Sequence, residues 1–305
     1  MEIVDAQIHE PHIGGGMAAR KPEGTTITPE MELFINTELA REAIDCVGVD
    51  RAIVYARREF NEAAVHYYPD RFGAVEVFDH AAADLEQQMA AFAAKPGMLG
   101  CRVLLTNYGQ VWRDPKAELK ATPLIEQGAF DNYWRFAAKY KIPMFFGAHG
   151  FAAKAAIAAE RHPDMTIIID HFGVTQSMAY PVENRWDALP GLLSLAKYPN
   201  VYVKLCGTPI ISKEAYPYHD IWNYIHKILH AFGAERCMWA SDMTRQRWGT
   251  ETPAGPGGFP PRSDWKPYAD ALYYLQYTNE ISQAEKEWIL GGTVRKALNW
   301  PTPAA

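Results

Sequence analysis

The chain has 305 residues, of which 48% are hydrophobic and 22% are charged, and its formal net charge is -6. This length suits either two average domains or one large α/β barrel, and the absence of a basic run argues against nucleic-acid binding. The four cysteines form no CxxC pair, which predicts neither a disulfide framework nor a thiolate zinc site and suits a reducing cytoplasm. No run of 18 apolar residues and no secretory segment follows Met1, so we expect neither membrane spanning nor secretion.

Short apolar runs alternate with longer amphipathic segments along the whole chain. The runs read as strands covered on both faces, and the segments between them read as helices. The predicted strands are Ile3–His9, Arg51–Tyr55, Phe72–Phe78, Gly100–Leu105, Pro143–His149, Thr166–His171, Val201–Leu205 and Met238–Ser241. The predicted helices are Glu38–Val47, Asp84–Ala94, Asp131–Tyr140, Ala152–Glu160, Trp186–Ala196, Asp220–Phe232 and Ser282–Trp300.

This alternation favours a parallel sheet, and eight units in 305 residues predict a single (β/α)8 barrel domain over residues 1–305. A doubly wound open sheet is the competing fold. It should carry a G-x-G-x-x-G turn, but Gly14–Gly16 after the first strand lacks that spacing. Long loops follow the carboxyl ends of three strands, where barrel active sites lie, and are expected to act as lids or substrate walls: Pro11–Pro29, Thr106–Gly128 and Met243–Arg262.

The first strand carries a polar stripe. Side chains alternate along a strand, so Asp5, Gln7 and His9 are expected on one face. Val4, Ala6 and Ile8 are expected on the other face. A polar stripe in a buried strand indicates a site.

Polar side chains end four of the predicted strands: His9, His149, His171 and Asp242. In a barrel these ends meet at one mouth. Neutral imidazoles bind divalent metals or donate hydrogen bonds to a carbonyl oxygen, and a carboxylate can take a proton from water. Such a set suits attack of water on an ester, lactone or amide carbonyl.

Several segments, in this order, resemble the amidohydrolase-related (amidohydrolase 2) branch of the amidohydrolase superfamily. The segments are VDAQIH, YYPDRFGAVEVFD, GMLGCRVL, IPMFFGAH, IIIDHFG, VYVKLCG and MWASD. That branch includes pyrone-dicarboxylate lactonase, sugar-acid lactonases and zinc-dependent aromatic acid decarboxylases. The resemblance implies a barrel fold and a lactonase-type hydrolase.

The first strand departs from the family pattern D-x-H-x-H, because Gln7 replaces the first histidine. In the metal-dependent relatives that histidine is a ligand, and an amide is a weaker partner for zinc than imidazole. We therefore expect that no metal is required. The alternative is one zinc or manganese ion held by His9, His149 and Asp242, with help from the Gln7 carbonyl.

The resemblance gives Asp242 the role of general base on a water molecule. His9, His149 and Gln7 would polarise the carbonyl, and His171 would join them or orient Asp242. Arg102, in an apolar strand, resembles an arginine that binds a substrate carboxylate in the lactonases. The alternatives for Arg102 are ion pairs with Glu76 or Asp79.

Other substrate contacts are expected from the loops. Arg245 and Arg247 follow Asp242 where relatives more often continue S-D-W-P, and they can bind an acidic or aromatic substrate. His12 follows His9 and is a further candidate. Asp170 is expected to point away from the barrel centre, and Cys206 is not expected to be a nucleophile.

The sequence thus predicts a cytoplasmic hydrolase that opens a lactone or similar ester of a small carboxylated ring compound, including aromatic-derived rings. Its partner would be the carboxylated small molecule, with no nucleic acid and no membrane, and the protein would be a monomer or homodimer. One alternative is a divalent-metal-dependent decarboxylase of an aromatic acid. The other is a catalytically silent protein that binds an organic acid, because a lost ligand such as the histidine replaced by Gln7 can mark a lost activity.

Overall fold

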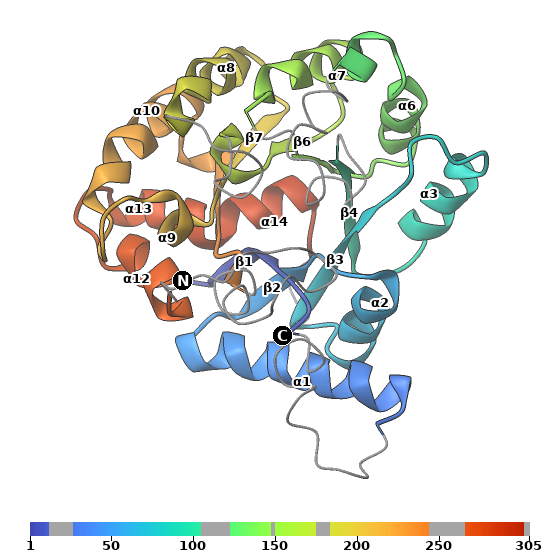
Figure 1. Ribbon diagram of the computed structural model, residues 1–305, viewed down its shortest axis with the longest axis horizontal. Helices are drawn as coiled ribbons and strands as arrows, with labels where there is room; N and C mark the ends of the chain where they lie inside the picture. Colours follow the sequence, from blue (N-terminus) through green and yellow to red (C-terminus); the bar gives the residue numbers. More distant parts are fainter. Residues whose placement is uncertain (12–26, 105–122, 148–149, 175–183, 244–265, 302–305) are drawn as a thin grey trace.

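In the computed structural model, eight parallel strands form one sheet in the order of the sequence. Figure 1 shows the strands gathered at the centre of the molecule. The structure describes residues 1–11, 27–104, 123–147, 150–174, 184–243 and 266–301. Sequential order in an eight-stranded parallel ring is the (β/α)8 barrel, and it excludes the doubly wound alternative. The strands are β1 Val4–Ile8, β2 Arg51–Val54, β3 Phe72–Val77, β4 Met98–Leu104, β5 Met144–Gly147, β6 Ile167–Ile169, β7 Val201–Cys206 and β8 Cys237–Ala240.

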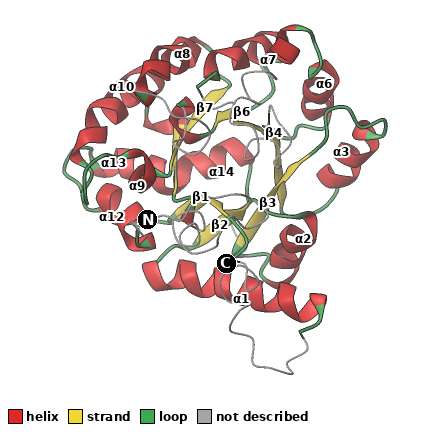
Figure 2. Cartoon of the chain, viewed as in Figure 1, coloured by secondary structure: helices red, strands yellow, loops and turns green. Residues whose placement is uncertain are grey.

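Helices surround the strands, as Figure 2 shows in red around yellow. They cover the outer apolar faces of the strands, which is why the strand sequences are apolar on both sides. The described helices are α1 Pro29–Val47, α2 Arg58–Tyr67, α3 Leu85–Ala93, α6 Asp131–Lys139, α7 Ala155–Arg161, α8 Leu189–Leu193, α9 Thr208–Ile211, α10 Trp222–Phe232, α12 Tyr268–Gln276, α13 Gln283–Glu287 and α14 Thr293–Leu298.

Two apolar layers follow from strand alternation. Val54 and Phe146 belong to the outer layer beneath the helices, whereas Ile53 and Phe145 belong to the layer inside the barrel. The inner layer also includes Trp300, which lies beside Gly73 near the start of β3. The C-terminal segment with α14 therefore closes the end of the barrel where the strands begin, and the opposite end remains for the site.

The helix predictions were incomplete at recognisable places. Helix α1 begins at Pro29 rather than residue 38, with the Thr28 hydroxyl accepting from Met31 N at 3.2 Å. A capping threonine followed by proline at the first turn is a helix start, so the helix begins where the predicted loop ends and is longer than expected. Helices α2 and α12 were not predicted, and the expected helix over Ser282–Trp300 is divided by a π-helix at Trp288–Gly292.

The predicted long loops lie largely outside the described residues. Within the described part of the chain, none of the helices combines the length and the apolar composition that crossing a bilayer demands.

Candidate active site

The first strand carries a local irregularity that re-aims its polar side chains. The pairing register of β1 with β2 shifts between Asp5 and Ile8. Val4 and Ala6 lie in the inner apolar layer, whereas Ile8 lies in the outer one. The prediction that these three residues share a face is therefore wrong, because an extra residue in a strand reverses the alternation beyond it.

The Asp5 side chain stabilises the register shift in β1, and it lies outside the inner apolar layer of the barrel. Its Oδ1 accepts from Gln7 N at 2.9 Å and from Ser241 N at 3.0 Å, and its Oδ2 accepts from the Tyr268 hydroxyl at 2.8 Å. Asp5 thus joins β1, the end of β8 and helix α12, and does not share the face of Gln7. Burial raises the pKa of Asp5 to about 6, although hydrogen bonds from Ser241 and Gln7 oppose the shift.

Asp242 follows β8 and meets the end of β1. Its Oδ1 accepts from Gln7 Nε2 at 2.7 Å and lies 2.9 Å from His9 Nε2. The backbone also joins the ends of β1 and β8, since Asp242 N donates to Gln7 O at 3.1 Å. Asp242 is fully buried and has a positive φ of 58°, a conformation that non-glycine residues adopt at a cost of about 1–3 kcal/mol.

Lys204 of β7 determines how the Gln7 amide is oriented. The Lys204 ammonium donates to Gln7 Oε1 at 2.5 Å, and an ammonium has no acceptor. The oxygen of the amide must therefore face Lys204, and its NH2 group must face Asp242 and His9. In this orientation Gln7 is a hydrogen-bond donor to the site, and its carbonyl is turned away from the position of a metal ligand.

His9 presents one particular nitrogen to Asp242. Its Nδ1 lies 2.6 Å from the carbonyl oxygen of Tyr55, which can only accept, so Nδ1 carries a hydrogen. Nε2 is then the nitrogen that faces Asp242. It carries a proton only when His9 is an imidazolium, and in that state it donates to the Asp242 carboxylate.

Behind this group lies a buried ionic cluster, the Arg102–Asp170–Lys204 cluster. Asp170 Oδ2 accepts from Arg102 Nε at 2.7 Å, and Asp170 Oδ1 lies 2.6 Å from Lys204 Nζ. Burial alone would raise the pKa of Asp170, but the two cations outweigh it and lower the pKa. The Lys204 ammonium also lies 4.5 Å from the centroid of the Tyr55 ring, which belongs to the inner apolar layer.

The direction expected for Asp170 is therefore wrong. Ile168 faces the inner layer, and alternation turns Asp170 inward with it. The chain then turns at His171 and Phe172, which have positive φ values of 48° and 57°. The sequence suggested Glu76 or Asp79 as an ionic partner of Arg102. The structure provides Asp170, and Glu76 pairs with Arg58.

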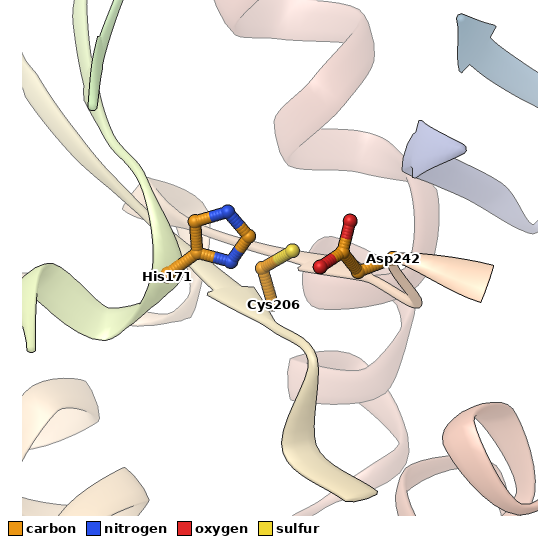
Figure 3. Close-up of side chains that lie close together, drawn as sticks. All are labelled: His171, Cys206 and Asp242. Atoms are coloured by element: carbon orange, nitrogen blue, oxygen red, sulfur yellow. The ribbon is translucent and has the colours of Figure 1, made fainter. Parts of the chain in front are cut away.

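The turn brings His171 to Cys206 and Asp242. One ligand atom of each of these three buried side chains lies within 4.8 Å of the others. Figure 3 shows the Cys206 sulfur between the His171 ring and the Asp242 carboxylate. Burial raises the pKa of the Cys206 thiol well above its ordinary value, and Asp242 adds to the shift, which disfavours a thiolate nucleophile.

The structure brings Gln7, His9, His171 and Asp242 together. His12, His149, Arg245 and Arg247 lie outside the described residues, so their roles remain predictions. Sequence reasoning missed Lys204. Its signal was present, because in Val201–Cys206 the period of two places Lys204 on the same face as the inward-facing Tyr202 and Cys206.

A parallel eight-stranded barrel with histidine, aspartate and amide side chains at the carboxyl ends of its strands defines an enzyme of the TIM-barrel class. The particular family follows from comparison with known proteins. The Amidohydrolase family model matches residues 4–300, and the chain belongs to this family. The family predicted from the sequence is thereby confirmed.

Individual relatives are more distant. L-fucono-1,5-lactonase from Burkholderia ambifaria is 33% identical over 92 residues, which span 29% of this chain and only 30% of the lactonase. An amidohydrolase from Burkholderia multivorans with bound zinc has a TM-score of 0.67 at 17% identity, covering 99% of this chain and 100% of that one. A probable 2-pyrone-4,6-dicarboxylic acid hydrolase from Acinetobacter baumannii, with citric acid bound, has a TM-score of 0.64 at 16% identity and covers 98% and 100%.

Two observations bear on the metal. A similarly folded amidohydrolase contains zinc, and His171, Cys206 and Asp242 form a donor group of the kind that zinc accepts. The donor group in this chain does not support the expectation that no metal is required.

Proposed function

We propose that the protein is a hydrolase that opens a lactone or similar ester of a small carboxylated ring compound, with Asp242 as general base. The observation that carries the proposal is the position of the Asp242 carboxylate. It is buried at the end of β8 and held at Oδ1 by Gln7 and His9. A carboxylate fixed in this way is oriented toward one direction before any substrate arrives, which is what proton transfer requires.

The reaction begins with attack of water on the lactone carbonyl. Asp242 accepts the proton of that water and returns it to the alkoxide that leaves as the ring opens. His149 is the predicted donor to the carbonyl oxygen as negative charge develops, while the Gln7 NH2 group and His9 keep Asp242 in position. Each donor of this kind contributes about 10²–10³ in rate.

A divalent ion at this site would polarise the carbonyl as a Lewis acid. The chain offers two sets of side chains for it. One is the predicted set His9, His149 and Asp242, of which His9 Nε2 and Asp242 Oδ1 lie 2.9 Å apart. The other is His171, Cys206 and Asp242.

The carboxylated substrate is supported by the cations near the site. Arg102 is buried, its Nε bonds Asp170, and it is the predicted contact for a substrate carboxylate. Arg245, Arg247 and His12 are the predicted contacts from the loops. Citric acid bound to a hydrolase of the same fold, and the acid and lactone substrates named for the relatives, support an anionic lactone.

The first test is Asp242→Asn against a panel of carboxylated lactones, with ring opening followed by proton release. The variant keeps the size of the side chain but cannot act as a base, so kcat/KM should fall about 10²–10⁴-fold. The matched control is Glu76→Gln, the same chemical change at a carboxylate of β3 that pairs with Arg58. Near-normal turnover by Asp242→Asn would refute the mechanism and favour a different base, whereas no turnover of any lactone by the wild type would favour the silent binder.

The same preparation distinguishes the decarboxylase alternative. Release of carbon dioxide from an aromatic acid, with no opening of any lactone, would replace the hydrolase proposal with that alternative.

A further inference from the structure

Three potential metal ligands converge from the ends of three neighbouring strands. His171 follows β6, Cys206 is the last residue of β7, and Asp242 follows β8. All three are 0% exposed, and their ligand atoms lie within 4.8 Å of one another (Figure 3). A thiol, an imidazole and a carboxylate gathered at one buried point form a donor set that a divalent cation can bind.

The two oxygens of Asp242 are not equivalent. Oδ1 is engaged by the Gln7 NH2 group and by His9 on the β1 side. Oδ2 lies near the end of β7, since a Cβ atom built on Gly207 would lie 3.9 Å from it. A cation that uses Oδ2 therefore approaches from the β7 side, where Cys206 ends its strand.

The β1 side is less favourable for a cation than the β7 side. The Gln7 amide turns its N–H groups toward Asp242 because the Lys204 ammonium holds its oxygen. A cation there would face the positive ends of the N–H bonds, with an ammonium group behind them. The β7 side offers sulfur and imidazole nitrogen, which bind zinc well.

We propose that His171, Cys206 and Asp242 bind one zinc ion, with Cys206 in place of the imidazole that Gln7 does not provide. On binding, the Cys206 thiol releases its proton to solvent and its sulfur forms the bond to zinc, without oxidation or reduction. A thiolate, a carboxylate and a neutral imidazole carry two negative charges, which balance Zn²⁺ in the buried site. Three protein ligands leave a fourth tetrahedral position open, as in catalytic zinc sites.

The spacing of cysteines along the chain did not indicate Cys206 as a metal ligand, because the three donors come from three different strands. It concerns metal binding and holds whichever reaction the site catalyses. Its failure would therefore leave the lactonase proposal standing, and loss of lactonase activity would not remove the metal site.

The test is substitution with cobalt, because Co²⁺ bound to a thiolate has a near-ultraviolet charge-transfer band that nitrogen and oxygen ligands do not give. The full chain is stripped with a chelator, reloaded with Co²⁺ and titrated. The wild-type protein should bind one equivalent with this band. Cys206→Ala should lose the band and bind Co²⁺ at least about 100-fold more weakly, since removal of even an outer partner of a metal ligand costs 10–100-fold.

Cys237→Ala is the control, because Cys237 is an equally buried thiol of β8 in the outer apolar layer. It should keep both the band and the stoichiometry. Cys206→Ser repeats the experiment with a side chain of similar size if Cys206→Ala does not fold. One equivalent of Co²⁺ without the band in the wild type, or no binding at all, would overturn the proposal.

Discussion

Asp170→Asn provides the most direct test of the buried ionic cluster. The substitution leaves Arg102 and Lys204 buried without the carboxylate that lies 2.7 Å and 2.6 Å from them. Breaking one buried ion pair by removing a partner costs about 3–5 kcal/mol. Because Asp170 serves two cations, we expect its loss to lower the free energy of unfolding by at least about 4 kcal/mol, measured by urea denaturation at pH 7.

Lys204→Met is the comparison variant, since it removes one cation but leaves Asp170 paired with Arg102. It should destabilise less than Asp170→Asn, and the double variant should be more stable than Asp170→Asn alone. The pKa of Asp170 is lowered in the folded protein, so its stabilising effect is complete above the unfolded value of about 3.8 and is lost as the pH falls further. If Lys204→Met destabilised more than Asp170→Asn, the assignment of Asp170 as the common partner would be wrong.

Two other predictions concern residues that touch Gln7. Lys204→Met should lower kcat about 10-fold or more with little change in KM, because the Gln7 amide is then free to turn its oxygen toward Asp242. An unchanged kcat would show that Lys204 does not position the Gln7 amide for catalysis. Asp5→Asn should abolish a pH dependence of stability. The pKa of Asp5 is raised from 3.8 to about 6, so the wild type loses about 2.4 kcal/mol of unfolding free energy as the pH rises from 4 to 7. Equal pH dependence in both proteins, measured by denaturation, would contradict this.

The barrel could be predicted because its signal is local and repeated. Each strand is a short apolar run, and β7 was predicted over Val201–Leu205 against Val201–Cys206 in the structure. The strand ends gave His9, His171 and Asp242 as a group. Helix α2 escaped prediction because it has only 10 residues, a length that is marginal for an isolated helix, and it is stabilised by packing against neighbours that the sequence does not reveal.

The direction of each side chain could not be predicted, because strict alternation assumes that no extra residue interrupts a strand. Strict alternation places Asp5 and Gln7 on the same face of β1, but the register shift in β1 separates them. The positive φ of His171 returns its imidazole to the site after Asp170 has already turned inward. Both irregularities lie at strand ends in the mouth of the barrel, where local departures from regular geometry are most often functional.

The change from histidine to Gln7 and the presence of Lys204 act as one feature. An ammonium 2.5 Å from the side chain at position 7 opposes any metal ligand there, because the cation would lie beside a buried positive charge. A glutamine suits that place, since it accepts from Lys204 with its oxygen and donates to Asp242 with its nitrogen. The amide thus fixes Oδ1 of the Asp242 carboxylate, and Oδ2 lies near the end of β7. The departure from the family pattern is therefore better explained as a displacement of the cation site than as its loss.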